Sequence, residues 1–165
     1  MIQSIRTFFQ RRMYPSSEIV AEPESDLNPL HIAACALLLE LAHADEEFSS
    51  AERNHIEAVL RRHFALDEET ADTLIEVAEA EREQAIDLYQ FTSLIRENYD
   101  LGQKTLLAEV MWGLILSDGQ IAQHEGWLLR KIANLLDLKP GYLADAKKTV
   151  AARLAEDGRT DPTYN

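Results

Sequence analysis

Two short stretches of the chain carry acidic side chains at the same spacing. Residues 44–52 read ADEEFSSAE, and residues 117–125 read SDGQIAQHE. Each stretch has an Asp, an apolar residue three positions later and a Glu seven positions after the Asp. Carboxylate oxygens are the ligands that hard divalent cations prefer, so these acids are the candidate metal ligands of the sequence. They are Asp45, Glu52, Asp118 and Glu125.

The second stretch looks like the end of an EF-hand calcium loop, but it is not one. In an EF-hand the sixth residue is Gly and the twelfth is Glu, which Gly119 and Glu125 satisfy. The first and third ligand positions would then be Leu114 and Leu116, which have no side-chain oxygen. The corresponding positions of the first stretch are equally unsuitable, so neither loop is an EF-hand.

Helix capping offers an explanation that needs no metal. Ser49 and Glu52 have the spacing of a capping box, in which the hydroxyl accepts a hydrogen bond from an early helix amide. In the second stretch Ala122 replaces the serine, and Glu125 only complements the helix dipole. The two aspartates follow helices, where a negative charge meets the dipole unfavourably, so each needs a compensating amide or cation. Both interpretations stay open: capping alone, or a divalent-ion site at which the two halves gather their carboxylates.

The segments around the two stretches form an internal repeat of helices. Abundant Ala, Leu, Glu and Arg, with few aromatic and β-branched residues, favour helices over strands. When Asp45 is aligned with Asp118, apolar residues at helical spacing coincide on both sides. Each half is therefore expected to supply a buried helix, an acidic loop, an apolar plug and an amphipathic helix. The aligned pairs are Phe48 with Ile121, Leu38 with Met111, Leu41 with Leu114, Ile56 with Leu129 and Val59 with Ile132.

The pattern divides the chain into four parts. Residues 1–13 form a short, basic amphipathic helix, and residues 14–29, with three prolines, form a linker. Residues 30–157 form the helical domain, and residues 158–165 form a tail. The domain shows about seven helical patterns and no credible strand. The predicted fold class is therefore all-α, a bundle of duplicated helical hairpins.

A few residues are expected to set the helix boundaries and faces. Asp67 and Asp87 are expected N-caps, Pro140 fits the first turn of the last helix, and DLG at residues 100–102 marks a break. The helix after the second stretch is expected to turn these residues inward: Trp127, Leu128, Ile132, Leu135 and Leu136.

The charge of the chain restricts its partners. With 29 acidic and 16 basic residues, the formal charge is −13. Nucleic acid is not an expected partner, because binding to phosphates depends on Lys and Arg. Cations and a basic protein are the expected partners of an acidic chain. Residues 67–83 hold eight acids and one Arg, and this segment is either a docking face for such a protein or a solvated helix face. Residues 1–13 either contact an anionic membrane surface or dock on their own domain. The oligomeric state stays open.

Other chemistry finds little support. The lone Cys35 is expected to be buried, and one cysteine cannot form a disulfide within the chain. Glu52 and His55 have the spacing used in di-iron bundles, but no second such pair exists, and the five histidines show no ligand pattern. We expect no catalytic residue and no cofactor other than a divalent ion. No apolar run reaches the roughly 20 residues that cross a bilayer, so a cytoplasmic location is expected, with residues 1–13 as a candidate contact to the inner membrane face.

The same motifs carry a resemblance to a known family. The segments LLLELAHADEEFSSAE, DLYQFTSLI and WGLILSDGQIAQHEGWLLRKIANLLDL resemble the TerB family, the helical tellurite-resistance-associated domain, and the related N-terminal region of DjlA-type membrane co-chaperones. The resemblance covers about residues 30–138. It implies an all-helical duplicated domain without known catalysis, and an acidic surface for metal ions at the four acids named above. It also implies a role in stress-response assemblies near the inner membrane face.

Two functions follow as expectations. The first is a non-enzymatic scaffold or sensor that binds a divalent cation through its paired acidic loops. The alternative is a protein interaction module that uses its acidic surface and whose loop acids serve only as helix caps.

Overall fold

The structure of the protein, a computed structural model, describes residues 27–45, 48–117 and 123–156. At Asp45 and at residues 123–125 only the main chain is described. Over these ranges the chain forms seven α-helices and one 3₁₀ turn, with no strand, and the predicted all-α class is confirmed. The elements are α2 (Pro29–Ala42), η1 (His43–Asp45), α3 (Ser50–His63), α4 (Glu68–Gln84), α5 (Tyr89–Asn98), α6 (Leu101–Leu116), α7 (Gln123–Leu135) and α8 (Pro140–Glu156).

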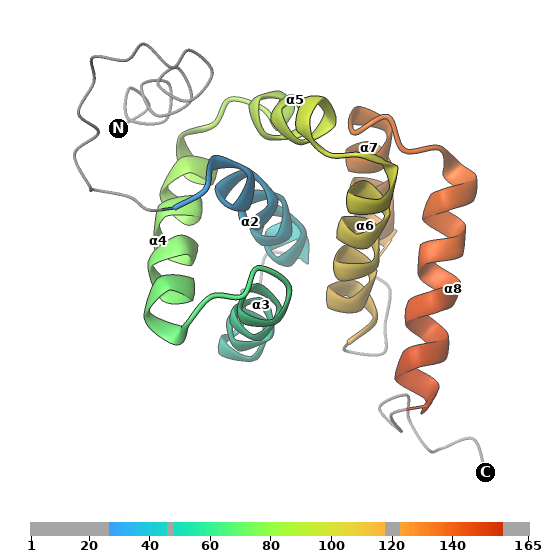
Figure 1. The fold of residues 1–165 in the computed structure, drawn as a ribbon, viewed down its shortest axis with the longest axis horizontal. Coiled ribbons are helices and arrows are strands. Elements are labelled where there is room, and N and C mark those ends of the chain that lie inside the picture. Colours follow the sequence, from blue (N-terminus) through green and yellow to red (C-terminus); the bar gives the residue numbers. More distant parts are fainter. Residues whose placement is uncertain (1–26, 46–47, 118–122, 157–165) are drawn as a thin grey trace.

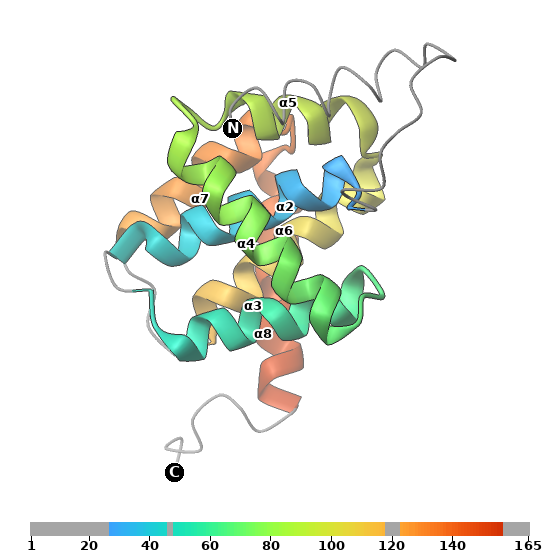
Figure 2. The ribbon, with the colours of Figure 1, turned by 90° about the vertical axis from the view of Figure 1, so that its left-hand side faces the viewer.

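Helix α2 is the centre of the bundle. Its sequence is apolar nearly all round, and a helix of that kind is stable in water only when other elements cover every side. It packs against α3, α4, α5, α6 and α7, and Figure 1 shows it enclosed among them, with α8 at the outer edge. Figure 2, seen from the side of α4, shows α4 crossing over α2. Asn28 begins the helix by accepting a hydrogen bond from the amide of Leu30 at 2.9 Å.

Helix α6 is the second apolar helix, and α8 covers one side of it. The two helices pack along each other. Their packing includes a buried polar contact, in which Trp112 Nε1 donates to the carbonyl oxygen of Leu143 at 3.0 Å. Lys147 lies over the same indole ring, 5.1 Å from its centroid. As predicted, Pro140 is the first residue of α8.

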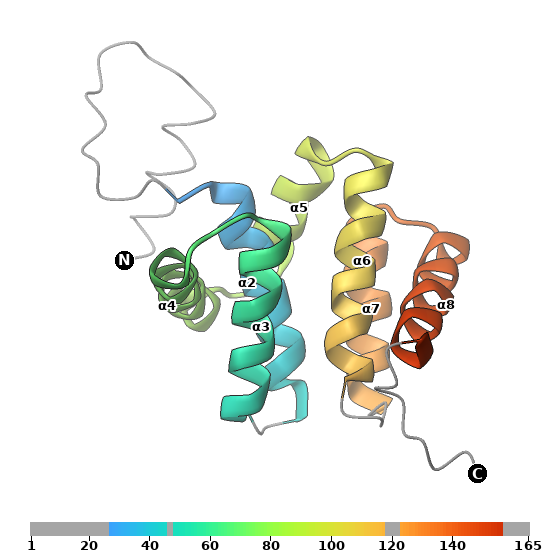
Figure 3. The ribbon, with the colours of Figure 1, turned by 60° about the horizontal axis from the view of Figure 1, so that its bottom comes forward.

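The internal repeat is visible as two helical hairpins, α2 with α3 and α6 with α7. Figure 3 shows them side by side, with the C-terminal ends of α2 and α6 at the same end of the molecule. At the four aligned pairs that lie on the helices, every residue is buried except Val59, which is half-buried. The buried members are Leu38, Met111, Leu41, Leu114, Ile56, Leu129 and Ile132.

Some of the expected boundaries and faces differ in detail. Asp67 is the N-cap of α4, as predicted. Asp87 accepts from the amide of Tyr89 at 2.9 Å, but the N-cap of α5 is Leu88. The predicted break at residues 100–102 is shorter than expected, because Asp100 and Gln103 form a reciprocal capping box and α6 begins at residue 101.

The prediction that Trp127 faces inward is wrong. This side chain is 51% exposed, whereas Leu128, Ile132 and Leu136 are buried and Leu135 is half-buried. Trp127 lies beside the buried stripe of α7 rather than within it, and Lys131 one turn later covers its ring at 5.4 Å from the centroid. The predicted N-terminal helix and tail, together with all but the last three residues of the predicted linker, fall outside the described residues.

Candidate functional site

A cavity of about 310 Å³ lies where the two hairpins meet. The first hairpin contributes the end of α2 and the beginning of α3, and the second contributes the end of α6. The cavity therefore adjoins the segments that lead into both acidic stretches. Its lining residues are Leu41, Ala42, Ser49, Ala51, Glu52, His55, Leu114, Ile115 and Ser117.

The first turn of α3 holds Glu52 in the cavity wall. Ser49 is the N-cap, and its hydroxyl accepts a hydrogen bond from the amide of Glu52 at 3.1 Å. The same hydroxyl lies 3.3 Å from Glu52 Oε1, to which it can donate. The predicted N-cap role of Ser49 is thus confirmed. Because the side chain of Glu52 points along the first turn, where the helix dipole favours negative charge, its carboxylate is compatible with the N-terminal end of α3.

The other three predicted ligands are placed only in part. The main chain of Asp45 ends η1, and that of Glu125 lies in the first turn of α7. These two elements pack against each other. The side chains of Asp45 and Glu125, and all of Asp118, lie outside the described residues. Ser117, which precedes Asp118, lines the cavity. The structure therefore brings Glu52, the end of α6, and the main chain of η1 and α7 to one end of the bundle (Figure 3), and the four-acid ligand set stays a prediction.

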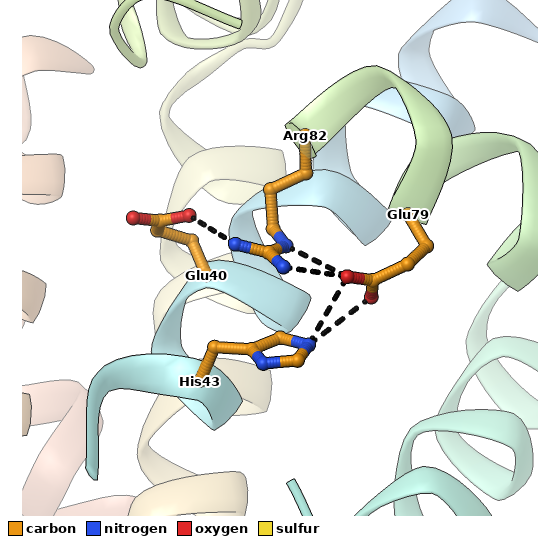
Figure 4. A network of polar contacts seen from close by, with 4 residues as sticks. All are labelled: Glu40, His43, Glu79 and Arg82. Atoms are coloured by element: carbon orange, nitrogen blue, oxygen red, sulfur yellow. Dashed lines mark hydrogen bonds and ion pairs between the residues drawn. The ribbon is translucent and has the colours of Figure 1, made fainter. Parts of the chain in front are cut away.

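A polar network fixes η1 to α4 beside this site (Figure 4). His43 Nε2 lies 3.1 Å from Glu79 Oε1, and Arg82 donates both to Glu79 and to Glu40 Oε2, the latter at 3.2 Å. Burial lowers the pKa of Arg82, but hydrogen bonds and charge from the two glutamates outweigh it and raise the pKa above its ordinary value. The network joins the acidic segment 67–83 to the main chain that leads into the first acidic stretch.

The apolar plug of the first hairpin also contacts this network. Phe48 is half-buried and packs against the core. Its ring stacks on that of His43, with 4.6 Å between centroids. Phe48 therefore has the role that the repeat predicted for it, whereas its counterpart Ile121 falls outside the described residues.

A second group of acids lies on the far half of α3 and the start of α4. Carboxylate oxygens of Glu57, Glu68 and Asp72 come within 4.8 Å of one another. Arg53 supplies the compensating charge, 3.3 Å from Asp72 and 3.9 Å from Glu57. Arg53 offsets one of the three negative charges, and the sequence pattern did not single the group out because two helices contribute to it.

Two titratable side chains with shifted pKa values lie outside the cavity wall. Cys35 is fully buried, as expected, and burial together with the charge of Glu79 raises its pKa well above the usual range, which makes the thiol unreactive. His31 stacks on Phe64 with 4.1 Å between centroids, and burial lowers its pKa. Neither group belongs to the candidate site.

Sequence reasoning missed one residue of the cavity wall. His55 lies one turn after Glu52 on α3 and lines the same cavity. The sequence did contain a signal, the three-residue spacing from Glu52, but the lack of a second Glu-x-x-His pair led to its rejection.

Comparison with known proteins gives one finding. The model of the family described as tellurite resistance protein TerB matches residues 31–148. That range includes both hairpins and the first turns of α8. No curated protein and no solved structure matches the chain. In the described part of the chain, no helix has the length and apolar character needed to cross a membrane.

Proposed function

Because the chain belongs to the TerB family, we propose that it is a non-enzymatic scaffold or sensor whose paired acidic loops hold a divalent cation between the two hairpins. The observation that carries the proposal is the cavity at the meeting point of the hairpins, with Glu52 in its wall. We infer that the carboxylates of both acidic stretches converge there, and converging carboxylates cannot all stay charged cheaply without a cation. The proposed ligands are Asp45, Glu52, Asp118 and Glu125.

The scaffold role is supported by the acidic face of α4. Its exposed acids offer a basic protein a docking surface, and the contact between Glu79 and His43 joins this helix to η1. A stress-response role of the kind that the family name suggests belongs to the same proposal. The exposed acids are Asp67, Glu68, Glu69, Glu76 and Glu83.

Calorimetric titration of the full chain with Ca²⁺, Mg²⁺, Mn²⁺ and Zn²⁺ tests the ion site. We expect saturable binding of at least one cation to the wild type, and its loss when Asp45 and Asp118 are both changed to Asn. The matched control changes Glu68→Gln and Asp72→Asn, which removes two charges from the group paired with Arg53, and it should leave binding intact. The ion proposal fails if no cation binds, or if the Asp45/Asp118 variant binds as well as the wild type.

The second candidate function is a protein interaction module without an ion. The contacts between Ser49 and Glu52 favour it, because they give one loop acid a role in capping α3. Capture of a basic partner should then weaken with added salt and survive treatment with a chelator. A chelator that abolishes capture would exclude this candidate.

We also propose that residues 1–13 contact a membrane surface, as their arginines and apolar residues favour. Sedimentation with vesicles containing anionic lipid tests this contact. The full chain should pellet more than a variant with Arg6, Arg11 and Arg12 all changed to Gln, and equal pelleting would refute the proposal.

A further inference from the structure

An apolar groove lies at the opposite end of the two hairpins from the candidate ion site. In Figure 3 the beginning of α2, the end of α3 and the beginning of α6 all lie toward the top of the molecule. Side chains from these three segments line a groove of about 210 Å³. Its apolar lining residues are Leu38, Val59, Phe64, Leu106, Leu107 and Val110.

The lining of this apolar groove is only partly covered by the described residues. Leu106 is 43% exposed, and Val59, Phe64 and Val110 are half-buried. An apolar cavity of about 150 Å³ admits a benzene molecule, so the groove has room for a phenyl ring. Amphipathic helices bind such grooves by laying their apolar side into them. The groove therefore fits an amphipathic segment that carries an aromatic residue.

The chain itself contains such a segment before the described domain. Residues 1–13 carry apolar residues at helical spacing, and two of them have phenyl rings. These residues are Ile2, Ile5, Phe8, Phe9 and Met13.

The described part of the chain begins beside the groove. His31, which lines the groove, lies in the first turn of α2, four residues after Leu27, the first described residue. Residues 14–26 span up to about 45 Å when extended, so residues 1–13 can reach the groove. A tether of this kind gives an effective concentration in the millimolar range. Even a weak contact is therefore enough to keep the groove occupied.

Charge favours one orientation of the segment. Residues 1–13 hold three arginines and no acid. On the side of the groove formed by α5 and α6, the exposed acids Glu97 and Asp100 flank its rim, whereas the α3 side carries the exposed Arg61 and Arg62. The arginines of the segment are therefore expected on the α5–α6 side.

We propose that the apolar groove is the docking site of residues 1–13 of the same chain, which cover it with their apolar side. The inference goes beyond the proposed ion site and does not rest on it. The proposed membrane contact uses the same apolar residues, so the groove and a lipid surface compete for them. The docked state is therefore tested without lipid.

Paramagnetic broadening in the full chain tests this docking. Cys35 is fully buried, so a nitroxide attached through Thr7→Cys labels the segment alone. We expect it to broaden the methyl resonances of Val59, Leu106 and Val110. The leucine methyl groups of the cavity at the other end of the hairpins should stay sharp, and they serve as internal controls.

Two variants and a matched control follow the same signals at Val59 and Val110. Leu106→Asp places a charge in the groove at an exposed position, and it should abolish the broadening. Changing Phe8 and Phe9 both to Ser should abolish it as well, without altering any residue of the described fold. The control Leu101→Asp changes a leucine of the same helix that is 47% exposed and does not line the groove, and it should keep the broadening.

Three results would overturn the inference. The first is equal broadening at both ends of the hairpins, and the second is broadening that survives both Leu106→Asp and the double serine variant. The third comes from a mixture of spin-labelled chains at natural isotope abundance and isotope-labelled chains without the nitroxide. If the groove methyl groups broaden as strongly in that mixture as within one chain, the occupant is the segment of a second copy.

Discussion

Replacing Arg82 by methionine tests whether α4 holds the end of α2 through charge. The Arg82 side chain is 17% exposed and bridges Glu40 on α2 to Glu79 on its own helix. Methionine keeps much of the apolar stem that packs between these helices but removes the guanidinium. The two carboxylates, which are 32% and 25% exposed, then lose their shared cation.

The size of the effect follows from the burial of these groups. A hydrogen bond to a charged group contributes about 1.5–3 kcal/mol net, and removal of one partner leaves the other partly desolvated. Solvent still reaches both glutamates, which reduces that penalty. We expect Arg82→Met to lower the free energy of unfolding by about 2 kcal/mol. For a chain of this length, that corresponds to a decrease in Tm of roughly 4–8 °C.

Urea denaturation of the full chain, followed by circular dichroism, measures this loss. The matched control is Arg53→Met, because Arg53 also bridges two helices but is 36% exposed, with contacts of 3.3 and 3.9 Å. An exposed pair of this kind contributes about 0–1 kcal/mol. The reasoning is refuted if the two variants lose the same stability, or if 1 M salt removes the loss in Arg82→Met as it would for a surface ion pair.

Three further predictions concern single side chains. Burial raises the pKa of Glu81 to about 7, so the folded state keeps this proton where the unfolded chain has lost it, and the free energy of unfolding falls as the pH rises from about 4.5 to about 7. Glu81→Gln should remove up to about 3 kcal/mol of that fall. Equal slopes of the urea midpoint against pH in the variant and the wild type would contradict this prediction. Trp112→Phe removes the indole donor to the buried carbonyl of Leu143, which keeps the main-chain amide of the next helical turn, and should cost about 0.5–1.5 kcal/mol in urea denaturation. An unchanged midpoint would contradict this prediction. Phe91→Ala empties a fully buried site and should lower the free energy of unfolding by about 3–5 kcal/mol. Tyr89 is 56% exposed, and Tyr89→Ala should change it by no more than about 0.5 kcal/mol. Thermal unfolding of the two variants measures the difference.

The fold was predictable because its determinants are local. The spacing of apolar residues fixes which side of each helix is buried, and this side agrees with the structure in both hairpins. Capping residues such as Asp67 and Pro140 act on the amides of their own helix, so sequence order alone locates them. The spacing wrongly placed Trp127 on the buried side of its helix. An aromatic residue next to an apolar stripe can lie outside that stripe when a neighbouring lysine covers its ring.

The candidate site was predictable only in part because its determinants are not local. Arg82 meets Glu40 across 42 positions of sequence, and no periodicity encodes that contact. The Glu-x-x-His spacing does not locate His55 in the cavity wall, because the cavity draws its other wall from α6, which carries no such pair. The spacing identified which acids share a loop, but the packing of the two hairpins decides which other side chains face them.

The two halves of the repeat agree in their core positions and diverge in their polar ones. Leu41 and Leu114 are both buried, whereas His43, which contacts Glu79, corresponds to Leu116, which packs against the core. The difference follows from the neighbours of each hairpin, because α3 packs against the acidic helix α4 and α7 packs against α8. A duplicated core must fill the same volume twice, so its residues stay alike. His43 and Leu116 face different neighbours in the two halves, so a ligand role at Glu52 implies no equal role at its counterpart. Each acid of the candidate site therefore has to be tested by its own substitution.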